Sequence, residues 1–335
     1  MKVFFSIIIP VFNRPDEINE LLESISSQDF AGVFEVVIVE DGSTDSSEHM
    51  VSAHADQLDI AYYKKQNTGP GDSRNFGMKK AKGNYFIILD SDCLLPRHYL
   101  SEVNRELQND FIDCYGGPDT AHVSFSAVQK AINHTMTSFL TTGGIRGGKK
   151  SVNQFQPRSF NMGISKNAFG GTGGFGKIHP GEDPDLTFRI WKAGYRTRLF
   201  SKAFVYHKRR MDWGRFYAQV KKFGKVRPIL NKWHPSTKKI TYWFPTLFTT
   251  GFFVSMVLGV LGYTWPLLVY ALYSTMIMVD ALVKTRSLWV SINAVFAAWV
   301  QFFGYGWGFL ISSMLINFSG KDLERLFPEL FFKNR

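Results

Sequence analysis

The sequence has little cysteine and comparatively little negative charge. Only two of its 335 residues are cysteines, Cys93 and Cys114. Two cysteines cannot build a disulfide framework, and their spacing matches no zinc motif, so we interpret both as reduced packing residues in a reducing compartment. The 39 Lys and Arg outnumber the 28 Asp and Glu, which gives a formal net charge of +11. The position of this excess positive charge in the sequence indicates what kind of partner it binds.

Acidic residues are almost absent from the most basic stretch. Residues 202–239 contain twelve Lys or Arg and one acid, Asp212, and residues 240–316 contain only three charged residues. A basic stretch can bind nucleic acid. When long apolar segments follow it, however, the positive-inside rule and anionic lipid headgroups explain it better. We therefore expect membrane lipids as partners, and no nucleic acid.

Three apolar blocks follow the basic stretch. Residues 242–263 and 265–283 have the length of membrane-spanning helices. Residues 288–318 are too long for one straight span and too short for two, and three glycines lie in their middle, so we expect a kinked span or a hairpin. The last residues form an amphipathic tail that can lie on a membrane surface. The expected organisation is a catalytic domain over 1–239, two to four transmembrane segments over 240–318 and a tail over 319–335.

The first part of the chain alternates between apolar strands and amphipathic helices. Residues 4–10, 34–39, 60–64 and 85–89 are predicted strands. Residues 1–11 are too short for a signal peptide and lack a cleavage site, so they are assigned to the first strand. Continuously apolar strands with short helical connections predict an α/β domain with a mainly parallel sheet, in which ligands bind at the carboxyl ends of the strands.

Two carboxylates follow the predicted strand 85–89. Asp90 and Asp92 are two residues apart, so in an extended segment both side chains point the same way and can address one cation or one diphosphate. Hard oxygen ligands of this kind suit Mg²⁺ or Mn²⁺. In the alternative interpretation, Asp90 opens a turn and Asp92 caps the helix that begins near Pro96.

Other polar residues stand at similar positions, each with an alternative role. Asp41 can accept a hydrogen bond from a nucleobase N–H, or it can form a tight turn. Arg74 begins a helix and can bind a phosphate, or it can be a solvated surface side chain. Glu182 and Asp183 follow a glycine-rich stretch and precede a helix. They can act in catalysis, or their negative charge can simply stabilise the start of that helix. His207 lies beside three cationic residues and is otherwise a surface residue.

Five motifs resemble, in their order, those of the family 2 glycosyltransferases of GT-A fold. The resemblance covers about two thirds of the chain and implies a Rossmann-like domain that binds a nucleotide sugar. Glu40 stands where Asp is frequent in the family, and Ser73 where Ala is frequent. The motifs are Ser6-Ile-Ile-Ile-Pro10-Val-Phe-Asn13, Val39-Glu-Asp41-Gly-Ser-Thr-Asp45, Asn67-x-Gly69 with Ser73-Arg74-Asn75-x-Gly77, Asp90-x-Asp92, and Gly181-Glu-Asp183-x-Asp185-Leu-x-x-Arg189.

The resemblance also implies roles for single residues. The acidic pair of Glu182 and Asp183 holds the catalytic base, which we assign to Asp183. Asp92 and Asp90 bind the metal, and His207 contacts the metal or the diphosphate. The residues expected to bind the donor are Pro10, Phe12, Asn13, Asp41, Gly69, Arg74 and Asp90.

Together these observations predict an inverting, metal-dependent glycosyltransferase. The donor is a nucleotide-diphosphate sugar, expected to be UDP-linked, and the acceptor is a hydroxyl of a membrane-associated, polyprenyl-linked saccharide in cell-envelope polysaccharide assembly. The Gln-x-x-Arg-Trp motif of processive members is absent, since Val-Lys-Lys-Phe follows Gln219. This favours transfer of a single sugar. Nucleotide sugars are made in the cytosol, so we expect a multi-pass inner-membrane protein with a cytosolic catalytic domain.

Two alternatives remain open at this point. In the first, the acceptor is a polyprenyl phosphate, whose phosphate needs little base catalysis to attack. In the second, the chain is a non-catalytic nucleotide-binding membrane scaffold. A scaffold has no need of two intact acidic clusters, which disfavours it.

Overall fold

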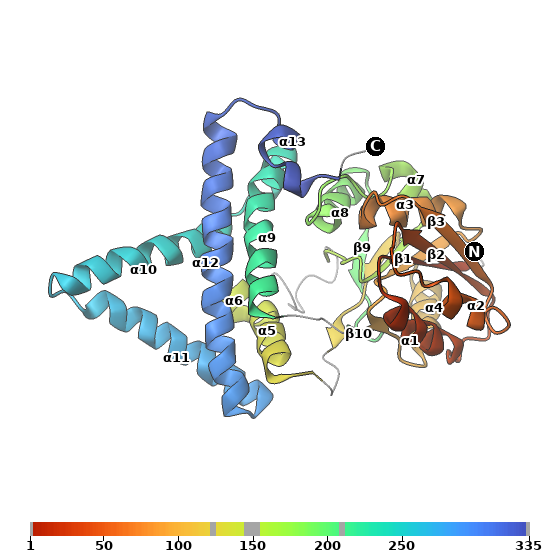
Figure 1. The fold of residues 1–335 in the computed structure, drawn as a ribbon, viewed down its shortest axis with the longest axis horizontal. Helices are drawn as coiled ribbons and strands as arrows, with labels where there is room; N and C mark the ends of the chain where they lie inside the picture. The colour runs from red at the N-terminus through yellow and green to blue at the C-terminus, as the bar shows by residue number, and fades with distance from the viewer. Residues whose placement is uncertain (1–2, 121–124, 144–154, 208–211, 333–335) are drawn as a thin grey trace. The chain divides into compact units, whose positions relative to one another are not determined.

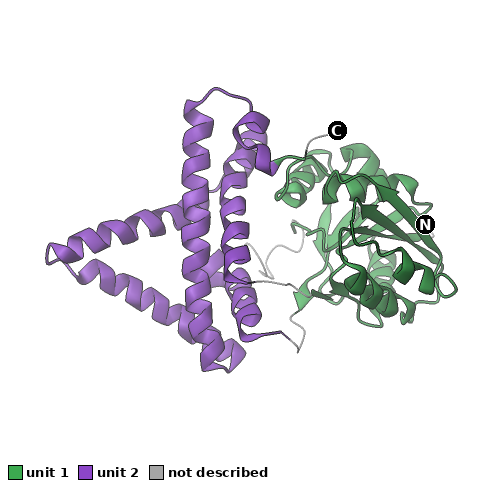
Figure 2. Ribbon diagram, viewed as in Figure 1, with its two compact units in different colours: residues 1–122, 149–208, 331–335 green, residues 123–148, 209–330 purple. Residues whose placement is uncertain are grey.

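The structure is a computed structural model that describes residues 3–120, 125–143, 155–207 and 212–332 (Figure 1). The chain divides into two compact units (Figure 2). The first unit contains residues 1–122, 149–208 and 331–335, and the second contains residues 123–148 and 209–330. Most of the basic stretch therefore packs with the apolar helices, whereas the sequence-based boundary at residue 239 assigns it to the catalytic domain.

A seven-stranded sheet with the order β3-β2-β1-β4-β8-β6-β9 forms the centre of the first unit. Its strands are β1 (Phe5–Val11), β2 (Phe34–Asp41), β3 (Ile60–Lys65), β4 (Tyr85–Leu89), β6 (Cys114–Gly116), β8 (Asn161–Ser165) and β9 (Thr197–Leu199). The first four strands are parallel to one another, β9 is parallel to β6, and β8 is antiparallel to both of its neighbours. The prediction of an α/β domain with a mainly parallel sheet is confirmed.

Helices cover both faces of this sheet. The helices of the unit are α1 (Pro15–Ser26), α2 (Glu48–Ala53), α3 (Pro70–Lys80), α4 (Tyr99–Asn109), α7 (Lys166–Thr172) and α8 (Glu182–Lys192). In β1, Ile7 and Ile9 pack into a core cluster with residues of α1 and α4, whereas Ile8 packs into a second cluster with residues of α3 and α8. Alternate strand residues face opposite sides, so a sheet buried on both faces needs continuously apolar strands.

A small second sheet has the order β5-β10-β7. It is formed by β5 (Cys93–Leu94), β7 (Asp119–Thr120) and β10 (Val205–His207). Strand β10 is antiparallel to β5, with His207 opposite Cys93. This pairing brings a residue late in the chain beside the acidic segment that follows β4.

The second unit is helical. Its helices are α5 (Ala127–Thr137), α6 (Phe139–Thr142), α9 (Trp213–Trp233), α10 (Phe244–Val260), α11 (Trp265–Thr285), α12 (Leu288–Phe318) and α13 (Leu323–Leu326). Three stretches are long and apolar enough to cross a membrane by length and composition: 240–260, which includes α10, and the whole of α11 and α12. These stretches support an association with membranes.

The third apolar block is one continuous helix, so it does not form the expected hairpin. Three glycines in the middle of α12 serve close packing instead of breaking the helix. A Cβ atom on Gly308 would lie 2.3 Å from the carbonyl oxygen of Lys221 in α9, and one on Gly306 would lie 2.4 Å from that of Pro245 in α10. Small residues let helix backbones approach this closely.

Candidate active site

The predicted polar side chains gather where the parallel strands end. Asp41 is the last residue of β2, and Asp90 directly follows β4. Strand β1 lies between these two strands and ends at Val11, directly before Phe12 and Asn13. Parallel strands have their carboxyl ends at one edge of the sheet, which is where ligands bind in open α/β folds.

Asp41 faces the loop that precedes α3. Its Oδ1 accepts hydrogen bonds from the Thr68 backbone N–H at 3.0 Å and from Lys65 Nζ at 2.7 Å. Its Oδ2 accepts one from the Gly69 N–H at 2.9 Å. A carboxylate oxygen has two lone pairs, so Oδ2 keeps capacity for a further donor such as a base N–H.

The neighbouring acid, Glu40, points elsewhere. It is buried and accepts hydrogen bonds from Ser43, from the backbone and hydroxyl of Ser47, and from the Tyr62 hydroxyl at 2.8 Å. These donors satisfy a charge that would be costly to bury alone. Glu40 therefore stabilises the turn after β2, while Asp41 is the acid at the predicted base site.

Asn13 positions the loop that follows Asp41. Its backbone has a φ of 53°, a left-handed conformation that asparagine tolerates better than most residues. Its side-chain oxygen accepts hydrogen bonds from the backbone N–H groups of Thr44 and Asp45, at 2.8 and 3.0 Å. Phe12, by contrast, leaves 49% of its surface exposed and is available for stacking. Pro10 is partly buried within β1.

Arg74 connects two of the acidic motifs. Its side chain is only 4% exposed, which excludes the solvated surface alternative. Nη2 donates to Asp90 Oδ1 at 2.7 Å, and Nη1 lies 3.5 Å from Glu182 Oε1. Burial opposes its charge, but the two acids outweigh that effect and raise the pKa of Arg74. The strand-end acid and the acidic pair of α8 are therefore held around one buried cation.

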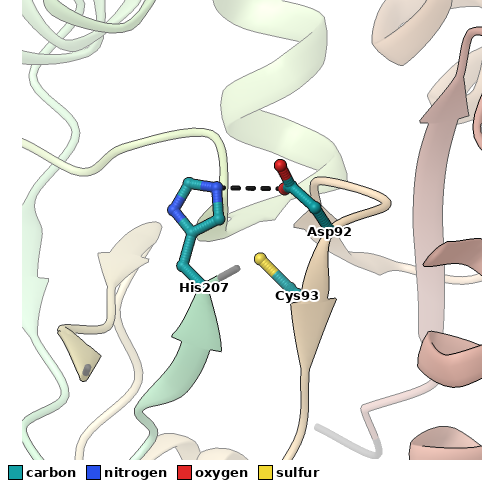
Figure 3. A group of neighbouring side chains, drawn as sticks. All are labelled: Asp92, Cys93 and His207. Carbon is teal, nitrogen blue, oxygen red and sulfur yellow. Dashed lines mark ion pairs between the residues drawn. The ribbon is translucent and has the colours of Figure 1, made fainter. Parts of the chain in front are cut away.

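Asp92 lies between a histidine and an arginine. His207 Nε2 lies 3.0 Å from Asp92 Oδ1 (Figure 3), and Arg14 Nη1 donates to Asp92 Oδ2 at 2.8 Å. Burial opposes ionisation of Asp92, but contact with His207 and Arg14 outweighs burial and holds its pKa below the ordinary value. Asp92 is thus an ionised carboxylate at neutral pH.

Asp92, Cys93 and His207 form a group of candidate metal ligands, with ligand atoms within 4.8 Å of one another (Figure 3). In the described part of the chain this group does not include Asp90. The Cys93 thiol is buried and donates to the Phe160 carbonyl oxygen at 3.4 Å, and burial raises its pKa well above the ordinary value. Metals bind the thiolate form, so Asp92 and His207 fit a divalent cation and the neutral thiol does not.

The acidic pair at the start of α8 contains two carboxylates in different electrostatic states. Glu182 is buried, but a 2.9 Å contact with His179 and the charge of Arg74 hold its pKa below the ordinary value. Burial, followed by repulsion from Glu182, raises the pKa of Asp183 to about 6. Asp183 Oδ1 is buried and has no hydrogen-bond partner among the described residues. Such an oxygen is suited to accept a proton near neutral pH.

A glycine-rich turn connects this pair to α3. Asn75 Nδ2 donates to the Phe175 carbonyl oxygen, and Asn75 Oδ1 accepts from the Phe175 N–H, both at 2.8 Å. Gly174 has a φ of 76°, and a Cβ atom there would lie 2.2 Å from Asn75 Oδ1, so only glycine fits. Asp185 binds Arg189 at 2.7 Å, and Arg189 Nη1 donates to the Thr172 carbonyl oxygen. Asp185 therefore has a structural role.

Several contacts at this site lie outside the reach of the sequence motifs. The sequence motifs do not include Lys65. It ends β3 directly opposite Asp41 in the sheet register, and this position could have indicated its contact with Asp41. Neither Arg14 nor His179 carries a sequence signal for its contact with an acid. The roles assigned to Asp183, Glu182, Asp90, Asp92 and His207 stay predictions.

Comparison with known proteins connects this geometry to a family. The sequence profile described as Glycosyl transferase family 2 matches residues 6–169. An uncharacterized glycosyltransferase of Rickettsia felis is 39% identical over 111 residues, which are 32% of this chain and 18% of that protein. The poly(ribitol-phosphate) beta-N-acetylglucosaminyltransferase TarS of Staphylococcus aureus is 36% identical over 101 residues, 29% of this chain and 18% of TarS. This chain thus matches less than a fifth of the length of either relative.

Solved structures extend the similarity over most of the chain. The mannosyltransferase PcManGT from Pyrobaculum calidifontis, in complex with GDP-Man and Mn²⁺, aligns with a TM-score of 0.57 and 17% identity over 96% of this chain and 89% of that chain. S. aureus TarS 1–349 in complex with UDP-GlcNAc aligns with a TM-score of 0.50 and 19% identity over 90% of both chains. At these identities the likeness concerns the fold.

Proposed function

This chain belongs to glycosyltransferase family 2, and from that membership we propose that it transfers one sugar from a nucleotide-diphosphate sugar to a hydroxyl of a membrane-associated acceptor. The proposed acceptor is a polyprenyl-linked saccharide, and the reaction inverts the anomeric configuration. The apolar helices support an acceptor that is itself held at a membrane. Cytosolic nucleotide sugars support a catalytic unit that faces the cytosol.

The observation that carries this proposal is the state of Asp183. An acceptor hydroxyl must lose its proton as its oxygen bonds to the anomeric carbon, and a positioned carboxylate with a pKa near the working pH takes that proton well. Asp183 has a pKa of about 6 and a buried carboxylate oxygen without a hydrogen-bond partner in the described residues. A phosphate acceptor is already ionised and has no use for such a base, so this observation favours the hydroxyl acceptor over the polyprenyl phosphate alternative.

The remaining site residues have roles that follow from their contacts. Asp41 would accept a base N–H, and Asn13 and Phe12 would wall the nucleoside. Arg74 stays charged and holds Asp90 and Glu182 in place at the edge of the sheet.

Asp92 and His207 would hold Mg²⁺ or Mn²⁺, which neutralises charge on the diphosphate. Their donor set, an ionised oxygen and an imidazole nitrogen, fits such a cation. PcManGT was solved with Mn²⁺ and GDP-Man, and TarS with UDP-GlcNAc, which supports a nucleotide-sugar donor and a divalent cation here. We propose a UDP-linked donor because TarS is both a sequence relative and a structural one.

Replacement of Asp92 by Ala tests the metal site. We expect the protein to fold normally but to need at least about 10–100-fold more Mn²⁺ for half-maximal transfer, because even neighbours of metal ligands contribute that much to affinity. Titration of Mn²⁺ into the detergent-purified protein in the presence of UDP, with donor turnover in parallel, measures this change. The exposed acid Asp56, replaced by Ala, is the matched control. An unchanged Mn²⁺ dependence in Asp92→Ala would remove Asp92 from the metal site.

The raised pKa of Asp183 predicts how transfer depends on pH. The base must be ionised, so kcat/KM should rise with pH through about 6 and level off above about 7. Below pH 5 Asp183 is protonated and transfer should be slow. Initial rates between pH 5 and 8 at saturating metal measure the profile, and the residual activity of Asp183→Asn should lack the rise. A flat profile in the native protein would contradict the assignment of Asp183 as the base.

A panel of nucleotide sugars tests the proposed function as a whole. The purified full-length chain in detergent is offered UDP-, GDP- and dTDP-linked sugars, with release of the nucleoside diphosphate as the readout. Turnover of one donor, stimulated by Mn²⁺ or Mg²⁺, is the expected result. Nucleotide binding without turnover of any donor, in the presence of membrane extract as an acceptor source, would favour the scaffold alternative.

A further inference from the structure

The path of the chain between the two units restricts how it can cross a membrane. The chain enters the second unit at residue 209 and returns to the first unit at residue 331. The return is paired: Phe331 forms an antiparallel bridge with Ile178, and the Phe332 N–H donates to the Lys177 carbonyl oxygen at 3.2 Å. The Phe332 ring also lies 5.7 Å from the ring of His179. Residues 207 and 331 are therefore on the same side of a membrane, and the chain crosses it an even number of times between them.

Three candidate spans lie in that interval, so they cannot all cross. Contacts of the segment 123–148 identify which ends of α11 and α12 stay on the same side of the membrane as the first unit. This segment leaves and re-enters the first unit, and its helices α5 and α6, of 11 and 4 residues, are too short to span a bilayer. Ser138 Oγ donates to Asp280 Oδ2 at 2.7 Å, and Thr135 Oγ1 donates to the Ala294 carbonyl oxygen at 3.1 Å. The end of α11 and the start of α12 are thus on this side.

The other end of α12 is tied to the same side. Ser312 Oγ donates to the Lys225 carbonyl oxygen of α9 at 2.7 Å, and Lys225 Nζ contacts Glu329 at 2.6 Å. Helix α9 carries six Lys and Arg within 21 residues, so it cannot lie in the hydrocarbon core. Gly304 and Gly308 hold α12 directly against this basic helix. Both ends of α12, and its middle, are therefore held to groups that stay on one side.

We propose that α12 does not cross the membrane but lies along its surface beside α9, and that the hairpin of α10 and α11 is the part that enters the bilayer. Figure 2 shows α9 and α12 side by side in the second unit. Helices α10 and α11 extend away from α12 and meet each other at a tip. The length of α12 agrees with this placement, since 31 residues at 1.5 Å each extend about 46 Å. The hydrocarbon core of a bilayer is about 30 Å thick.

The exposed face of α12 fits a lipid surface over the whole helix. Large apolar side chains on it remain 47% to 85% exposed. They are spaced seven, eleven, seven and four residues apart, which corresponds to about two, three, two and one helical turns, so they share one face. The glycine-packed contacts with α9 lie elsewhere on the helix. The exposed apolar residues that share this face are Trp289, Phe296, Trp307, Met314 and Phe318.

Aqueous labelling of single cysteines tests the topology in the full-length chain. The native cysteines are both buried and serve as the unlabelled background. Gln57→Cys reports the side of the first unit, Arg286→Cys the start of α12, and Lys321→Cys the residues after its end; all three positions are exposed. We expect a membrane-impermeant maleimide to label either all three cysteines or none of them in intact cells. In inside-out vesicles, too, the three cysteines should be labelled alike. If Lys321→Cys is labelled from the side opposite to Gln57→Cys, the proposal is wrong.

Depth measurements along α12 provide a second test. Spin labels at positions 289, 296, 307 and 318 in reconstituted protein are compared for collision with oxygen and with a water-soluble nickel chelate. A surface helix places all four labels at a similar shallow depth. A crossing helix would place position 307 deepest and the end positions shallow, which would overturn the proposal. Neither test uses sugar transfer, so each can fail or succeed independently of the proposed enzymatic activity.

Discussion

Asp183→Asn is expected to retain nucleotide affinity while transfer falls by about 10²–10⁴-fold, the usual cost of losing a general base. Asparagine keeps the size of the side chain but cannot accept the hydroxyl proton. In the proposed function the donor is held by groups at other positions, such as Asp41 and the metal site, so its binding should survive. Measuring UDP affinity and transfer on the same purified variant separates these two effects.

The matched control for this variant is Asp16→Asn, which changes an exposed acid in the first turn of α1. It should leave both quantities unchanged. Full transfer activity in Asp183→Asn would remove this residue as the base and favour a phosphate acceptor. Loss of nucleotide binding would instead show that Asp183 supports the structure of the site.

Arg74→Met should lower both the stability of the first unit and its activity. Methionine keeps much of the length of the side chain but leaves Glu182, 7% exposed, without the cation that it contacts. Removing one partner of a buried ion pair typically costs about 3–5 kcal/mol in the free energy of unfolding. The thermal unfolding midpoint in detergent should fall accordingly. Transfer should also fall, because Asp90 and Glu182 would lose the cation that holds the two acidic motifs together.

Two further variants make this result interpretable. Arg105→Met removes an arginine that pairs with Glu102 at 2.6 Å on the exposed face of α4, and it should have little effect on unfolding. Arg74→Lys keeps the charge but loses the planar guanidinium group, which contacts both Asp90 and Glu182. Its thermal unfolding midpoint should therefore lie between those of the native protein and Arg74→Met. An unchanged midpoint in Arg74→Met would show that Arg74 is not the cation that holds the two acidic motifs together.

The fold of the first unit was predictable because its signals are local. A sheet covered on both faces needs strands that are apolar at every position, and such runs are visible over 34–39 and 85–89. The polar residues that follow these runs mark the carboxyl ends of the strands. Asp41 and Asp90 therefore lie at the predicted edge of the sheet.

The membrane region was only partly predictable from the same kind of signal. Its apolar length is local information, and the three candidate spans were found. The alternative of a hairpin in α12 was wrong because the effect of Gly304, Gly306 and Gly308 depends on what packs against them. A glycine in an isolated helix weakens it, whereas a glycine under the backbone of another helix is required there.

The sequence by itself determined the strand-helix order, the parallel sheet and the strand-end positions of the acidic motifs, because hydrophobic periodicity acts over a few residues. Only the tertiary structure decided the charge states and partners at those positions. Arg74 meets Glu182 across 108 positions, and Asp92 meets His207 through the pairing of β5 with β10. A pKa near 6 for Asp183 arises from burial and from repulsion by Glu182, which outweigh the opposing charges of Arg74 and Arg158. The return of Phe331 to Ile178, which limits the number of membrane crossings, is likewise a contact between segments with no common local pattern.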